Sequence, residues 1–275
     1  LRTQGEYAQK IDGRAGKLLR GLPAAAERTA WTPASTHSGE PRGEASGHLN
    51  PAAFVNFLQN HDQIGNRALG ERLAQLCEPE PLRAAFAVFL LAPQLPMLFM
   101  GEEYAARQPF YYFCDYSDEL ADAVRDGRRE EFSGFAAFSD EKLREQIPDP
   151  NALQTFERSR LVWGERTQPA HKGWWEFVTQ LLRLRAQRGA PLIRNIEPRR
   201  STFSIEGHAL NVSWPTSQGE VLQLIANLSE HTSRVSDVPD DRELIFATSS
   251  VHTEETVRTN VVAPWEVRVF VHRPS

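Results

Sequence analysis

The chain has 275 residues, of which 40% are hydrophobic and 24% charged, and its formal net charge is −5. These values are typical of a globular protein with room for one large domain or two moderate ones. Lysine and arginine are scattered along the sequence, which argues against a nucleic-acid partner. Cys77 and Cys114 are too few for a disulfide framework, so we expect a cytoplasmic protein, and the two cysteines lack the spacing of metal ligands.

The ends of the chain and its one long apolar stretch bear on targeting. Leu1 to Arg20 lacks the apolar segment of a secretory signal. Ala84 to Met100 is interrupted by two prolines and a glutamine and is shorter than the ~20 residues that a membrane span needs. We therefore expect no membrane partner. Because the chain starts at Leu1 rather than methionine, we expect a removed leader or a longer parent protein.

The first informative stretch is Phe54 to Arg67. Phe54 to Leu58 is apolar and aromatic, which predicts a buried strand. A polar cluster follows at once, and in a (β/α)8 barrel such a strand end faces the cleft. We interpret Asp62 as a site carboxylate and His61 as its neighbour in the site. The alternative is a simple turn in which Asn60 or Asp62 caps the next helix.

A second unit of the same kind follows. The apolar spacing after Pro81 predicts an amphipathic helix that ends at Pro93, and Pro96 to Met100 predicts another buried strand. This alternation is typical of βα units. Glu102 and Glu103 come directly after the strand, so they are expected at the cleft end, with Glu103 the better candidate for lining a site. The alternative is a solvated carboxylate pair without function.

The stretch FVNFLQNHDQIGNRALGER at 54–72 resembles the seventh-strand motif of the α-amylase superfamily, in particular its maltooligosyltrehalose trehalohydrolase branch. The strand before Gly-Glu-Glu resembles the eighth barrel strand, and VRDGRREEF at 124–132 and IPDP at 147–150 also match that branch. The resemblance implies that Asp62 stabilises the transition state. It also implies substrate contacts from Asn60, His61, Gln63, Arg67, Glu103 and Asp115. Tyr116 departs from the family, where a histidine follows the aspartate, and this weakens the assignment of a sugar contact there.

The expected organisation is a partial barrel over 1–190 followed by a β-sandwich over 191–275. Residues 8–38 read as an insertion and residues 104–170 as a long excursion of loops and helices. Pro109 to Tyr116 is aromatic, which suits carbohydrate stacking or, alternatively, a flap packed on the barrel rim. A charged helix is predicted over 118–131, and a strong amphipathic helix over 174–188 should end at Gly189.

Period-2 alternation begins after Ile193. It predicts short strands at 202–205, 209–214, 220–228, 243–248 and 266–272. Short antiparallel strands of this number fit a small sandwich.

The family reaction hydrolyses the α-1,4-glucosidic bond next to the trehalose end of maltooligosyltrehalose, with retention of configuration. The resemblance implies an α-glucan oligosaccharide as partner and a reaction that needs no metal or organic cofactor. A retaining enzyme needs a nucleophile and an acid about 5 Å apart, and none of the acidic residues before the first motif ends a convincing strand. We expect both groups upstream of Leu1, with the rest of the barrel, and a fragment that is inactive alone. The alternatives are a non-catalytic carbohydrate-binding or interaction protein and another α-amylase-superfamily specificity, such as branching or debranching.

Overall fold

A computed structural model describes residues 46–135, 138, 140–236, 242–248 and 260–273. The insertion expected at 8–38 lies outside the described residues. The chain forms two compact units. Among the described residues, one contains Gln59–Cys77 and Leu98–Phe177, and the other contains residues 46–58 with Glu78–Met97 and Val178–Ser275. The expected domain boundary at residue 190 stays a prediction.

The second of these units opens with the short helix η1 (Pro51–Ala53) and the strand β1 (Val55–Asn56). β1 pairs in parallel with β2 (Leu95–Pro96), and the N–H of Leu95 donates to the carbonyl of Phe54 over 2.8 Å. The predicted parallel neighbours are therefore present, but each is only two residues long. The prediction that 54–58 and 96–100 are buried is wrong, because Val55, Met97 and Met100 are 59%, 40% and 41% exposed. A two-stranded sheet lacks the neighbouring strands that bury the faces of a barrel strand.

Helix α4 (Pro79–Leu91) joins these two strands, and its buried residues include Leu82, Phe86 and Phe89. It begins at a proline, which suits the first turn of a helix. At its other end, Arg185 donates to the carbonyls of Leu90, Ala92, Pro93 and Gln94. One guanidinium thereby satisfies carbonyls at the helix end that have no partner within the helix.

Helix α8 (Pro169–Leu184) does not end where the sequence predicts. A single π-helical turn, η5 (Arg185–Gly189), continues into α9 (Ala190–Ile193). Gly189 has φ −77° and ψ −50°, an ordinary right-handed helical backbone, so the prediction that it terminates the helix is wrong. Pro191 is accommodated because it lies in the first turn of α9, where a proline costs no hydrogen bond.

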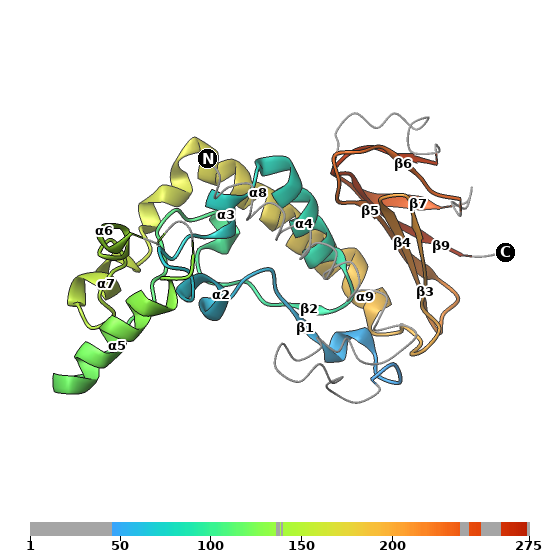
Figure 1. The fold of residues 1–275 in the computed structure, drawn as a ribbon. Coiled ribbons are helices and arrows are strands. Elements are labelled where there is room, and N and C mark those ends of the chain that lie inside the picture. The colour runs from blue at the N-terminus through green and yellow to red at the C-terminus, as the bar shows by residue number, and fades with distance from the viewer. Residues whose placement is uncertain (1–45, 136–137, 139, 237–241, 249–259, 274–275) are drawn as a thin grey trace. The chain divides into compact units, whose positions relative to one another are not determined.

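The C-terminal sheet has five antiparallel strands in the order β3-β4-β5-β9-β7 (Figure 1). They are β3 (Thr202–Glu206), β4 (Ala209–Pro215), β5 (Val221–Asn227), β9 (Val267–His272) and β7 (Glu243–Ala247). The sequence predicts all five to within a few residues. It does not predict β6 (Ser233–Arg234) and β8 (Val261–Val262), which pair with each other.

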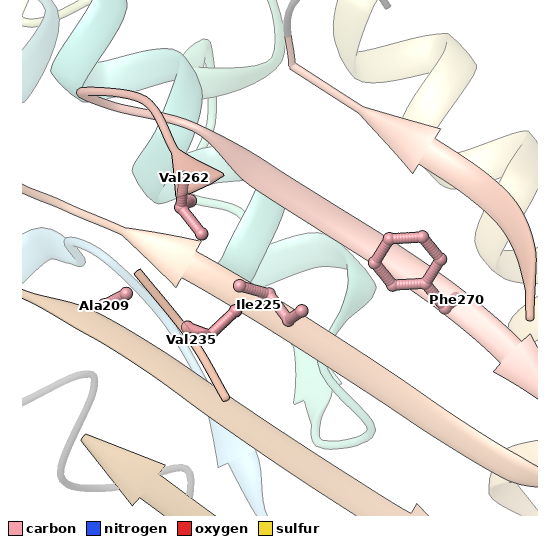
Figure 2. Packing of buried hydrophobic residues seen from close by; sticks show 5 residues of the cluster. All are labelled: Ala209, Ile225, Val235, Val262 and Phe270. Carbon is pink, nitrogen blue, oxygen red and sulfur yellow. The ribbon is translucent and has the colours of Figure 1, made fainter. Parts of the chain in front are cut away.

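The core of this β-domain lies against one face of the sheet. Ala209, Ile225 and Phe270 come from the five-stranded sheet, whereas Val262 comes from β8 and Val235 directly follows β6 (Figure 2). All five side chains are at most 1% exposed. The short β6–β8 ribbon therefore forms a second layer, and the predicted small sandwich is confirmed. Every residue of β5 is buried, and helix α4 contacts β5 and β9.

The other compact unit is built from short helices. They are α2 (His61–Gly65), α3 (Leu73–Leu76), η2 (Glu102–Tyr104), α5 (Asp118–Glu131), α6 (Glu141–Arg144), α7 (Leu153–Arg158), η4 (Trp163–Thr167) and the first half of α8. Arg128 of α5 is buried and donates to the carbonyls of Gly65 and Arg67, so α5 is tied to the end of α2. None of the helices in the described ranges is long and apolar enough to cross a membrane.

Candidate active site

The first predicted site segment folds as helix α2, and its N-terminus is capped by its own polar residues. The Asn60 side chain accepts from the N–H groups of Asp62 and Gln63 over 2.9 and 3.2 Å. The Gln63 side chain in turn accepts from the Asn60 N–H over 2.8 Å. This reciprocal arrangement is a capping box. The interpretation of Asn60 as a helix cap is therefore confirmed, and the substrate contacts of Asn60 and Gln63 stay predictions.

The capping box presents His61 and Asp62 outward from the first turn of α2. Their side chains are 68% and 72% exposed, and His61 Nε2 lies 3.8 Å from Asp62 Oδ1. The two groups are close enough to act on one ligand. Exposed carboxylate and imidazole groups of this kind can accept from and donate to sugar hydroxyls.

Arg67 lies inside the protein rather than at its surface. It is 8% exposed, and its guanidinium donates to the carbonyl of Glu71. This arrangement places Arg67 as a support for the loop that follows α2, and its predicted contact with substrate stays untested.

The second predicted site segment is a tight loop at Gly101. Gly101 has φ +82°, and a Cβ atom there would lie 2.7 Å from Ala106 Cβ and from a methyl group of Leu161. Glycine is required on both counts, because other residues rarely adopt this backbone and the space is filled. The loop closes through a 2.8 Å hydrogen bond from the Ala106 N–H to the Gly101 carbonyl.

The two adjacent carboxylates of this loop have different environments. Glu102 is 3% exposed and accepts from the Phe99 N–H over 2.9 Å, whereas Glu103 is only partly buried. Burial raises the pKa of Glu102 to about 7, although the Phe99 N–H, the Gln59 side chain and the charge of Arg72 oppose the rise. Of the pair, Glu103 is therefore the carboxylate within reach of a ligand.

The raised pKa of Glu102 predicts a pH-dependent stability. Since the folded protein holds this proton more tightly than an unfolded chain with the ordinary pKa of 4.5, the stabilisation is complete below pH 4.5 and is lost as the pH rises towards 7. The free energy of unfolding should fall by about 3 kcal/mol across this window from this group alone. Glu102→Gln should remove that dependence, as measured by denaturant unfolding at pH 4.5, 6 and 8. Glu176→Gln, at an exposed position on α8, controls for the loss of one charge, and a Glu102→Gln curve parallel to wild type would contradict the prediction.

Helix α3 connects the two site segments. The N–H of Leu73 donates to Gln59 Oε1 over 3.0 Å, and Gln59 directly precedes the capping box. The Arg72 guanidinium donates from Nε to the carbonyl of Gln108 over 2.6 Å and from Nη1 to that of Met100 over 2.8 Å. Nothing in the local sequence pattern marks Arg72, because the carbonyls that it contacts lie 28 and 36 residues farther along the chain.

The aromatic segment after the Gly101 loop is partly packed and partly exposed. Phe110, Phe113 and Phe156 form edge contacts, with ring centroids 5.7 and 5.3 Å apart along the series. Tyr111 is buried and accepts a hydrogen bond from Arg158. Tyr112 and Tyr116, by contrast, are exposed, as is Asp115. The packed rings fit the flap interpretation, and sugar stacking by the exposed rings stays a prediction.

The described residues contain no group of three or more histidine, cysteine, aspartate or glutamate side chains placed to hold a metal ion. The candidate site residues of this unit carry carboxylate, imidazole, amide and aromatic groups. Carbohydrate recognition commonly uses these groups, since hydroxyls need paired donors and acceptors.

Comparison with known proteins identifies the family to which this chain belongs. Residues 198–269 match a family model described as a domain of unknown function (DUF3459). A malto-oligosyltrehalose trehalohydrolase from Deinococcus radiodurans is 42% identical over 197 residues, 72% of this chain and 32% of the relative. A protein of the same name from Brevibacterium helvolum is 34% identical over 222 residues, 80% of this chain and 36% of the relative. The chain belongs to the maltooligosyltrehalose trehalohydrolase family of the α-amylase superfamily. It spans about a third of the length of these two relatives.

A solved structure agrees with this family assignment. A candidate α-amylase from Salmonella typhimurium is 36% identical, with a TM-score of 0.78 over 92% of this chain and 41% of that one. The predicted fold class, part of a (β/α)8 barrel followed by an antiparallel β-domain, is thereby confirmed.

Proposed function

We propose that this chain is the C-terminal part of a cytoplasmic glycoside hydrolase that releases trehalose from maltooligosyltrehalose. The enzyme would hydrolyse the α-1,4-glucosidic bond next to the trehalose end. The observation that carries the proposal is the parallel β1–β2 pair, after which the chain continues to Asp62 in α2 and to Glu103 in η2. Over 197 residues this chain is 42% identical to a named trehalohydrolase. The cytoplasmic assignment rests on the low cysteine content, because a sequence with only Cys77 and Cys114 cannot form a disulfide framework.

The proposed mechanism is retaining. One carboxylate attacks the anomeric carbon while a carboxylic acid protonates the glycosidic oxygen, and water then hydrolyses the glycosyl-enzyme ester. We propose that both groups come from sequence outside this chain. Asp62 would accept hydrogen bonds from ring hydroxyls that strengthen as positive charge develops on the ring, and so lower the barrier.

The other predicted site residues would hold the sugar. His61 would bond a hydroxyl beside Asp62, since it shares the exposed first turn of α2. Asn60 and Gln63 use their side-chain oxygens in the capping box, which leaves their amide NH₂ groups as the donors for a hydroxyl. Glu103 and the exposed Asp115 would accept hydrogen bonds farther along the oligosaccharide, and the buried Arg67 would support the loop.

The test is an assay of the protein expressed from the longest reading frame that contains this chain. Its substrates are a maltooligosyltrehalose, a linear maltooligosaccharide of equal length and a branched glucan, with products separated by chromatography. We expect trehalose from the first substrate and much slower hydrolysis of the other two. Comparable cleavage of all three would favour another specificity of the superfamily. Binding without hydrolysis would favour a non-catalytic carbohydrate-binding protein.

A further inference from the structure

Arg72 is an almost fully buried cation in the unit that carries the candidate site. It is 1% exposed, and burial lowers its pKa, while the charges of Glu102 and Glu103 oppose that change. Its principal hydrogen bonds go to backbone carbonyls rather than to a carboxylate. Burying a guanidinium is energetically unfavourable unless hydrogen bonds compensate for the lost solvation. The hydrogen bonds from Arg72 to this loop therefore matter for the structure of the loop.

The two carbonyls that Arg72 contacts lie on either side of the loop that carries Glu103. Met100 directly precedes Gly101, and Gln108 lies two residues after Ala106. The guanidinium carbon also lies 5.4 Å from the ring centroid of Phe99, in the segment that enters the loop. The guanidinium is planar and its N–H donors have a rigid arrangement, so Arg72 holds the two ends of the loop at one separation.

The backbone next to Arg72 is bonded to the other site segment. Leu73 donates to Gln59, and Gln59 leads directly into the capping box that presents Asp62. The Arg72 N–H itself donates to Gln75 Oε1 over 3.0 Å, which holds the start of α3 in place. Two adjacent residues therefore connect the Asp62 segment to the Glu103 loop.

We propose that Arg72 is a positioning residue that fixes the Glu103 loop relative to Asp62 for binding of the oligosaccharide. The proposal rests on the proposed function, because Glu103 is taken there as a sugar contact. Arg72 touches no substrate itself. It acts through the ends of the loop, and its loss should weaken substrate binding through Glu103 rather than the bond-breaking step.

The test is Arg72→Lys in the protein from the longest reading frame. A lysine keeps the charge but cannot donate to both carbonyls from one planar group. We expect KM for maltooligosyltrehalose to rise roughly tenfold with kcat nearly unchanged, as for a contact made equally in the ground and transition states. In a Glu103→Gln background the same change should raise KM by less than about twofold, because coupled residues do not act additively.

Arg185→Lys is the matched control, since Arg185 also donates to several backbone carbonyls but belongs to the other compact unit. It should leave KM unchanged. If Arg72→Lys does not fold, Gln75→Met removes the exposed acceptor of the Arg72 N–H and should raise KM in the same direction but less. The proposal would be overturned if folded Arg72→Lys had the KM of wild type. It would also be overturned if the double variant raised KM by the product of the factors for Arg72→Lys and Glu103→Gln.

Hydrogen exchange separates this inference from the proposed function. Amides of residues 101–108 should exchange faster in Arg72→Lys while those of β5, in the other compact unit, stay as in wild type. This result would support the positioning of the loop even if the wild-type protein released no trehalose. Equal exchange in the two proteins, or a uniform increase along the chain, would refute it.

Discussion

Asp62→Asn is expected to lower trehalose release by the protein from the longest reading frame roughly a thousandfold. Both kcat and kcat/KM should fall, because a carboxylate that bonds ring hydroxyls most strongly in the transition state contributes little to ground-state binding. An asparagine keeps the size of the side chain but removes the charge that the developing oxocarbenium ion needs. The measurement is steady-state release of trehalose from maltooligosyltrehalose.

The stability of this variant should stay close to wild type. The Asp62 side chain is 72% exposed, and the cap of α2 uses its backbone N–H rather than its carboxylate. Asp126→Asn, which removes an exposed carboxylate from α5, controls for the loss of a surface charge and should keep full activity. If Asp62→Asn retained activity within tenfold, equivalent to about 1.4 kcal/mol, Asp62 would be a turn residue and the functional interpretation would fail.

Elements that depend on local patterns were predictable from the sequence. Helix α5 occupies 118–131 as predicted, because its polar and apolar residues alternate at helical spacing between two loops. The five long strands of the β-domain were also predicted, since alternation at period 2 fixes which side chains face the core. The family motif at 54–72 is equally local, and relatives of the same name support it.

Features that depend on contacts between distant residues were not predictable. Whether Asn60 caps a helix or contacts a sugar cannot be read from its type, because the same carboxamide suits both roles. Strands β6 and β8 are two residues each and carry no periodicity, so only their pairing reveals them. The hydrogen bonds of the Arg185 guanidinium likewise go to carbonyls that lie more than 90 residues earlier in the chain.

The part of the barrel present here exposes apolar side chains that a complete barrel would cover. Val55, Leu95 and Met97 are 59%, 50% and 40% exposed, and they lie on or directly beside the β1–β2 pair. Each of these two short strands has one neighbour in the described chain. Exposed apolar side chains and unpaired strand edges favour association between copies.

We therefore expect the isolated 275-residue chain to associate in solution and to release no measurable trehalose from maltooligosyltrehalose. Acid and nucleophile must act together to cleave a glycosidic bond at a useful rate, and under our proposal this chain supplies neither. Sedimentation velocity measures the association, and chromatography of the products measures the hydrolysis, with the protein from the longest reading frame as the positive control. Activity that follows the isolated chain through purification would contradict the proposal. Glu102, Glu103 and Asp115 would then be the first residues to replace, because they are the carboxylates in and after the Gly101 loop.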